Sequence, residues 1–348
     1  MPASPPPPAT QQSHTPAGNL RTQLDLLLSE QVMIVAKESA AAVNHSDEYA
    51  GYTGLLATNS ADLAALFGRA FGTTTSTQLA QAWNVQNGYL VDYAIGVVTH
   101  NDARANGAMS GLTNGFVPQF AQLIRDASRM PLDPVTQLAS QQVLEDKAFI
   151  DDLFAGHYAT YYADLHRAYA QTSRFGDALA AQIAQDFPDK FPGDPSAHRL
   201  DVRVSLNELL QEHSYLATMA TDSVIANRGA EKTAAQAALA ANADMLGTVF
   251  ATNFGNSVGT QFDKVWAARD AAIVGYASGD AAAKQSLTET FVASFAPLAK
   301  VGASPVASQV DATLKVIDDQ RAKAAKTIAG DDRAAATAMQ PIADSIEG

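Results

Sequence analysis

The chain has 348 residues, of which 47% are hydrophobic and only 7% aromatic, and its formal net charge is −13. That charge argues against binding to nucleic acid or to anionic membranes, because both need clustered lysine and arginine. The sequence contains no cysteine, which excludes disulfides, thiolate chemistry and iron–sulfur clusters. Its alanine-rich, aromatic-poor composition predicts an all-α protein, since alanine loses the least free energy on entering a helix.

The first 18 residues are rich in proline, serine, threonine and glutamine, and we expect them to form a disordered tether. This stretch resembles the start of a mature protein whose signal sequence has been removed, which predicts a secreted or extracytoplasmic protein. A native disordered cytoplasmic tail is the alternative. No apolar run approaches the length of about 20 residues that a membrane span needs, so no membrane span is predicted.

After the tether, apolar residues at helical spacing predict a first bundle over residues 19–186. Residues 73–77 are expected to form a loop, and Pro118 should kink or break the helix that contains it. Gly156 should end the fifth helix of this bundle. The six helices are expected at residues 19–44, 48–71, 76–100, 102–128, 135–155 and 158–186.

A proline-rich linker at residues 187–199 then leads to a second predicted bundle over residues 200–348. Short connections between successive helices predict antiparallel packing, with a four-helix core and extra helices in each bundle. The six helices of the second bundle are expected at residues 200–227, 230–254, 259–278, 281–301, 305–329 and 331–346.

The two predicted bundles share a sequence pattern. The run LLSEQ at 27–31 returns as LLQEH at 209–213, and Trp83 with Tyr93 returns as Trp266 with Tyr276 at the same spacing. A repeat of this length predicts two tandem domains related by internal duplication.

The stretch FGDALAAQIAQDFPDKFPG at 175–193 is distinctive. Together with Leu-Leu-x-Glu in the first helix and Trp83 followed by Val91-Asp92-Tyr93, it resembles an uncharacterised family of secreted bacterial helical-bundle proteins. Some members of that family stand beside a copper-amine-oxidase-like N-terminal domain. The resemblance covers residues 20–300, and it implies four inward-facing histidines in each bundle. Such a set would suit copper, iron or haem.

This sequence departs from the family's histidine pattern. The first bundle has glutamine at all four positions, namely Gln31, Gln86, Gln142 (or Gln141) and Gln171. The second bundle keeps His213 but has Arg269, Val316 and Ser345 at the others. An amide oxygen is a poorer ligand for these metals than imidazole, so we expect no metal and no cofactor, with copper, iron or haem as the alternative. The glutamines are interpreted as a structural remnant, or else as a small polar pocket that binds a ligand through hydrogen bonds.

Glu30 and Glu212 occupy equivalent positions in the repeat and could serve as acid, base or ligand. The alternative that we favour is that each carboxylate pairs with a neighbouring helix, for example with Arg269 in the second bundle.

Two further groups of residues have a plain structural interpretation. Glycines at 107, 111 and 115 recur every four residues, which predicts close packing of two helices or a self-association face. Histidines at 45, 100, 157 and 166 are expected at or near helix ends on the surface.

Motifs of common enzyme classes are missing from the sequence. It has no Gly-x-Ser-x-Gly nucleophile elbow, no phosphate loop and no Glu-x-x-His pair. We therefore expect a non-enzymatic, extracytoplasmic structural or interaction protein of the bacterial envelope, which self-associates or binds a cell-surface protein. The alternative is a helical bundle that binds a small ligand or a metal.

Overall fold

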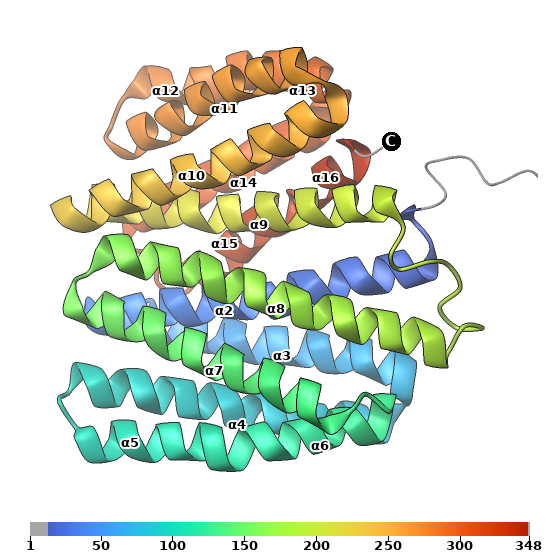
Figure 1. The fold of residues 1–348 in the computed structure, drawn as a ribbon. Coiled ribbons are helices and arrows are strands. Elements are labelled where there is room, and N and C mark those ends of the chain that lie inside the picture. Colours follow the sequence, from blue (N-terminus) through green and yellow to red (C-terminus); the bar gives the residue numbers. More distant parts are fainter. Residues whose placement is uncertain (1–12, 347–348) are drawn as a thin grey trace, which may run out of the picture.

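Helices form the whole framework of residues 13–346, the part of the chain that this computed structural model describes, and no β-strand occurs there (Figure 1). The predicted all-α class is confirmed. Most of the predicted tether, residues 1–12, lies outside the described residues. Its last three residues are helical instead, because the Thr15 side chain caps the first helix by accepting a hydrogen bond from the Gly18 N–H at 3.1 Å.

The first half of the chain, which we call bundle 1, comprises residues 13–186, and the second half, bundle 2, comprises residues 198–346. The helices of bundle 1 are α2 (Pro16–Val43), α3 (Tyr49–Phe71), α4 (Thr73–Val98), α5 (Asp102–Ser110), η1 (Gly111–Phe116), α6 (Val117–Ser128), α7 (Leu132–Ala155) and α8 (Tyr158–Asp186). Those of bundle 2 are α9 (His198–Ile225), α10 (Gly229–Phe254), α11 (Asn256–Ala277), α12 (Ala281–Gln285), η2 (Ser286–Phe291), α13 (Val292–Ala299), α14 (Ala303–Ala322), α15 (Ile328–Thr337) and α16 (Gln340–Ile346).

Two sequence expectations about these helices were wrong. Residues 73–77 are helical rather than a loop, because the chain turns from α3 into α4 at Gly72 alone, where φ is +89°. The α-helix is interrupted close to Pro118, as expected, but by the π-helical turn η1, and Pro118 lies in the first turn of α6 that follows it. The predicted final helix at 331–346 is divided into α15 and α16.

The two bundles repeat several structural details. A π-helical turn interrupts the fourth helical segment of each, as η1 and as η2. Trp83 packs on Phe116 and Phe120, and Trp266 packs in the same way on the phenylalanines of η2 and α13. These parallels are consistent with internal duplication, which stays a prediction.

The bundles meet along their first helices, α2 and α9, which pack against each other in the middle of the molecule (Figure 1). One helix of each bundle also contacts the other bundle: α8 packs on α2 and on α10, whereas α15 packs on α9 and on α3. Buried apolar side chains from both halves form one continuous cluster. The linker between α8 and α9 therefore joins two bundles that share a core.

The glycine repeat contributes to packing within bundle 1 at one position only. A Cβ atom at Gly111 would collide with the ring of Tyr89 on α4, so this glycine permits a close helix–helix approach. A Cβ atom at Gly107 or Gly115 would meet nothing within 4 Å. No helix of the described residues is both long and apolar enough to cross a membrane.

Candidate functional site

The four glutamines predicted at the centre of bundle 1 do come together. They lie on α2, α4, α7 and α8, and all line one cavity of about 20 Å³: Gln31, Gln86, Gln142 and Gln171. Of the two candidates on α7, Gln142 faces the cavity, whereas the Gln141 amide donates to Glu145 Oε1 at 2.5 Å. The positions that the family resemblance implied as inward-facing thus form an inner polar surface.

The hydrogen bonding of this cavity indicates what fits it. Trp83 Nε1, Gln86 Oε1 and Gln142 Oε1 are buried and have no hydrogen-bond partner among the described residues. One donor and two acceptors match a single water molecule, which accepts one hydrogen bond and donates two, and the cavity volume is that of about one water. Amide oxygens with an indole N–H do not fit copper, iron or haem, which prefer imidazole or thiolate.

Two of the four glutamines are held in place by buried neighbours. The Gln31 amide donates to Asn87 Oδ1 at 2.8 Å, and the Gln142 amide donates to Asp146 Oδ1 at 2.7 Å. Burial raises the pKa of Asp146 to about 7, although the bond from Gln142 opposes this shift. The arrangement is a hydrogen-bonded polar core, which supports the structural interpretation of the glutamines.

His213 occupies the corresponding centre of bundle 2 and is fully buried. Its Nδ1 lies 3.0 Å from Asn242 Oδ1, and the amide group of Asn242 donates to Glu212 Oε2 at 2.9 Å. Since this fixes Oδ1 as the acceptor, His213 Nδ1 carries a proton. The Nε2 atom lies 3.0 Å from both Asp270 Oδ1 and Trp266 Nε1. Both ring nitrogens are therefore engaged within the protein.

Arg269 lies beside His213, as predicted, and it binds neighbours that the sequence did not reveal. Its Nη1 donates to Asp270 Oδ1 at 3.1 Å, and its Nη2 donates to Gln309 Oε1 at 3.3 Å. The guanidinium also lies 4.8 Å from the centroid of the Trp266 ring, a cation–π contact.

Two other residues assigned to this centre were placed wrongly. Val316 packs with Ile328 and Ala335 in a small separate cluster, and Ser345 donates to Pro341 O near the C-terminal end. Within residues 13–346, no group of three or more His, Asp or Glu side chains has a geometry that could hold a metal ion.

Glu30 is paired with neighbouring helices, as the favoured interpretation of the sequence predicted. It accepts hydrogen bonds from Asn59 Nδ2 at 2.8 Å and from the Tyr215 hydroxyl at 3.2 Å. Arg333 of α15 donates to both carboxylate oxygens, at 3.1 and 2.9 Å. Arg333 also forms an ion pair with Asp62 at 2.7 Å. The carboxylate therefore links α2 to α3, α9 and α15.

Glu212 repeats half of this arrangement. Asn242 donates to it in the same way that Asn59 donates to Glu30, but its charged partner is His166 of α8, with Nδ1 at 2.8 Å. Neither glutamate pairs with Arg269. The hydrogen bond with Glu212 raises the pKa of His166. Since this histidine lies within α8, the expectation that it lies near a helix end was wrong.

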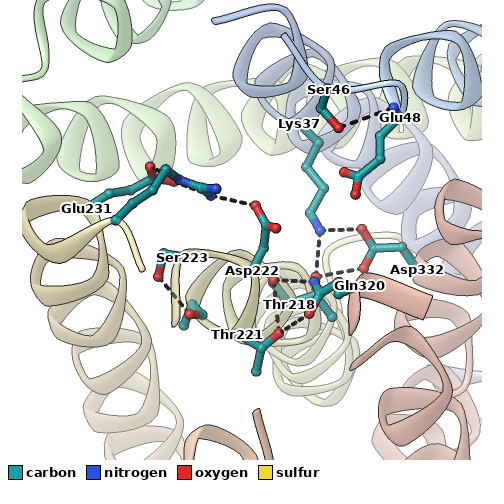
Figure 2. Close-up of polar contacts among 12 residues, drawn as sticks. Lys37, Ser46, Glu48, Thr218, Thr221, Asp222, Ser223, Glu231, Gln320 and Asp332 are labelled. Carbon is teal, nitrogen blue, oxygen red and sulfur yellow. Dashed lines mark hydrogen bonds and ion pairs between the residues drawn. The ribbon is translucent and has the colours of Figure 1, made fainter. Parts of the chain in front are cut away.

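A third interface cluster surrounds Lys37, which the sequence analysis did not single out (Figure 2). The Lys37 ammonium lies 2.5 Å from Asp332 Oδ2 and donates to Thr218 Oγ1 at 2.7 Å. The Thr218 and Tyr52 hydroxyls both donate to the same aspartate, at 2.7 and 3.1 Å. In the sequence, Lys37 interrupts the apolar run of α2. This interruption could have indicated that a charged side chain is buried there.

A cavity of about 60 Å³ adjoins the Lys37 cluster. Around it, Arg228 binds Asp222 and Glu231 with ion-pair distances of 2.5 and 2.6 Å. The cavity has room for very few water molecules. We therefore interpret the cluster as a polar contact that connects the two bundles.

Three larger grooves open at the surface. The first, of about 540 Å³, lies between the bundles beside Glu30 and Arg333. The second, of about 500 Å³, lies between α10 and α11. The third, of about 810 Å³, lies between α11 and the segment from α12 to α13. All three volumes fall in the range of about 300–1,000 Å³ that is typical of ligand pockets. The buried centres are too small for such a role, so these grooves are the candidate binding sites.

Comparisons with known protein families, with curated proteins and with solved structures give no significant match to this chain.

Proposed function

We propose that this chain is a non-enzymatic interaction protein of the bacterial envelope, and that α10 and α11 form the surface on which it holds a helix of a partner protein. The groove of about 500 Å³ between these two helices carries the proposal. Placement in the envelope rests on the composition of the N-terminal residues and on the family resemblance.

The floor of this groove consists of small and apolar side chains. Leu239 is buried beneath it, and alanines from both helices line it: Ala240, Ala243, Ala267 and Ala271. Alanine side chains are short, so a third helix can approach α10 and α11 closely. Its apolar side chains can then pack between these two helices.

The rim of the groove is acidic. Asp244, Asp263 and Asp270 line it, together with one neutral amide and no lysine or arginine. Asp270 is already bound to Arg269 and His213, whereas no ion pair in the described structure involves Asp244 or Asp263. Charge complementarity therefore favours a partner helix with lysine or arginine beside its apolar face. The net charge of −13 disfavours a second copy of this chain as the occupant.

The proposal is tested with an amphipathic helical peptide of leucine and lysine, labelled for fluorescence anisotropy. We expect saturable binding that weakens as salt is added, because exposed charges are screened. Asp263→Lys and Ala243→Arg should each weaken binding by about tenfold or more. Asp311→Lys, which makes the same charge change at an exposed position of α14, is the matched control. Equal weakening by Asp311→Lys and Asp263→Lys would show that net charge, and not the groove, attracts the peptide.

Metal or haem binding is the alternative function suggested by the family resemblance. The residues at the two bundle centres do not fit such a group, as described above. Elemental analysis and an absorbance spectrum of protein purified from its native host would test this alternative directly. One equivalent of copper, iron or haem would revive it and direct attention to His213.

A further inference from the structure

The groove between the bundles is independent of the α10–α11 surface. Its walls come from α2, α3, α9, α15 and α16, so neither bundle forms it alone, and its volume is about 540 Å³. That volume exceeds the need of a single amino acid and suits a small organic molecule. The walls present charged, amide and apolar side chains, which together restrict the chemistry of a ligand.

The charged end of the groove is already neutralised. Arg333 binds Glu30 through two hydrogen bonds and Asp62 through an ion pair. Glu30 is saturated by its partners, and only Asp62, with a half-exposed side chain, still faces solvent. Glu30 and Arg333 therefore shape the wall, and the recognition groups have to be sought elsewhere in the groove.

Asn207 contributes an acceptor without a partner. The residue is only 2% exposed, and its Oδ1 has no hydrogen-bond partner among the described residues. Its amide group donates to Arg203 O and to Asp344 Oδ1, both at 3.0 Å, which fixes Oδ1 as the free acceptor. An unpaired buried acceptor costs about 1–3 kcal/mol, so an N–H or O–H donor of a ligand would be favoured here.

Arg69 contributes a cation at the same groove. Its Nη2 donates to Gln23 Oε1 at 2.7 Å, and no carboxylate of the described chain lies within ion-pair distance of it. An exposed guanidinium of this kind binds a carboxylate through two hydrogen bonds. Between these polar groups, Leu26, Leu27 and Leu66 present an apolar surface.

We propose that this groove binds a small zwitterion with apolar groups, the chemistry of a short apolar peptide. Its carboxylate binds Arg69, its N–H group donates to Asn207 Oδ1, and its apolar groups pack on the leucines of α2 and α3. The site lies across both bundles, so their rigid junction positions the recognition groups.

The test uses the full chain and the dipeptide leucyl-leucine, with binding measured by calorimetry and mapped by amide chemical shifts. We expect saturable binding, with shift changes at the groove. Arg69→Gln should weaken it by about tenfold or more, the loss of one charge-assisted contact. The matched control is Arg125→Gln, which removes another exposed arginine, on α6, and should leave the affinity unchanged.

A second comparison uses N-acetyl-leucyl-leucine amide, which has the same apolar groups but no charges. Equal affinity for the two peptides, or wild-type affinity in Arg69→Gln, would overturn the zwitterion proposal, as would the absence of saturable binding by the dipeptide. Asn207→Leu tests the second recognition group and should also weaken binding. If Asn207→Leu does not fold, the test still rests on Arg69→Gln, because substitution of an exposed residue leaves the fold intact. Asp263→Lys changes the α10–α11 surface but not the groove between the bundles, so it should leave dipeptide binding unchanged. The partner-helix proposal and the zwitterion proposal can therefore fail separately.

Discussion

Two interfaces between the bundles each contain a buried glutamate, but the glutamate has a different basic partner in each. We call the interface formed by α15 the α15 seam and the interface formed by α8 the α8 seam. At the α15 seam, Glu30 is held by Asn59 and by two hydrogen bonds from Arg333. At the α8 seam, Glu212 is held by Asn242 and by a single hydrogen bond with His166. An arginine keeps its charge at every physiological pH, whereas the charge of a histidine depends on pH.

The α15 seam also contains the Lys37–Asp332 pair, which lies deeper in the interface. Permanent charges thus join α15 to bundle 1, while α8 is joined to bundle 2 by a contact that responds to pH. Two similar glutamates thus have different charged partners, because the helix that packs on them from the other bundle supplies the partner.

The largest difference should appear when each glutamate is neutralised. Glu30→Gln leaves Arg333 without its main partner in a half-buried position, and we expect it to lower the free energy of unfolding by about 3 kcal/mol. Glu212→Gln should cost about 1 kcal/mol, since His166 can become neutral. Urea denaturation of both variants at pH 7 measures the difference, and equal losses would contradict the proposed asymmetry of the seams.

A smaller effect is expected at the deeper pair of the α15 seam. Lys37→Met should lower the free energy of unfolding by about 2 kcal/mol, because the fully buried Asp332 keeps only the hydroxyls of Tyr52 and Thr218. Adding Asp332→Asn should restore most of the loss, since no charge then remains buried. Methionine is a suitable substitute, because Met219 occupies the corresponding position of the repeat. A double variant less stable than Lys37→Met would refute this account.

The smallest effect is the pH dependence of the α8 seam. His166 has a raised pKa in the folded protein, so its stabilising contribution is complete below the ordinary histidine value and is lost as pH rises through the raised value. Because the side chain is 43% exposed, solvent screening keeps this contribution below about 1 kcal/mol. His166→Gln should therefore lower the melting temperature at pH 5.5 and leave it unchanged at pH 9. An equal loss at both values would exclude a role for the histidine charge.

The candidate sites differ in how well the sequence revealed them. The four glutamines were found because they stand at the positions where the resembled family has histidine, and they line one cavity. The partners of the glutamates were missed, since Arg333 lies 303 positions from Glu30 along the chain. Gln309 and Asp270 were missed as well, because a single polar residue on a helix gives no signal of which neighbour it will meet.

The sequence by itself determined the helical class and many helix limits. Tyr158–Asp186 was predicted as a helix and is α8, and Gly156 ends α7 with φ of +72°. These features depend on interactions within about four residues, which the sequence displays directly. Only the tertiary structure decided which charges meet across α2, α9 and α15, and where grooves remain open. The reason is physical: burial and pairing depend on helices brought together by a shared core, and each charge is stabilised by partners far away in the chain.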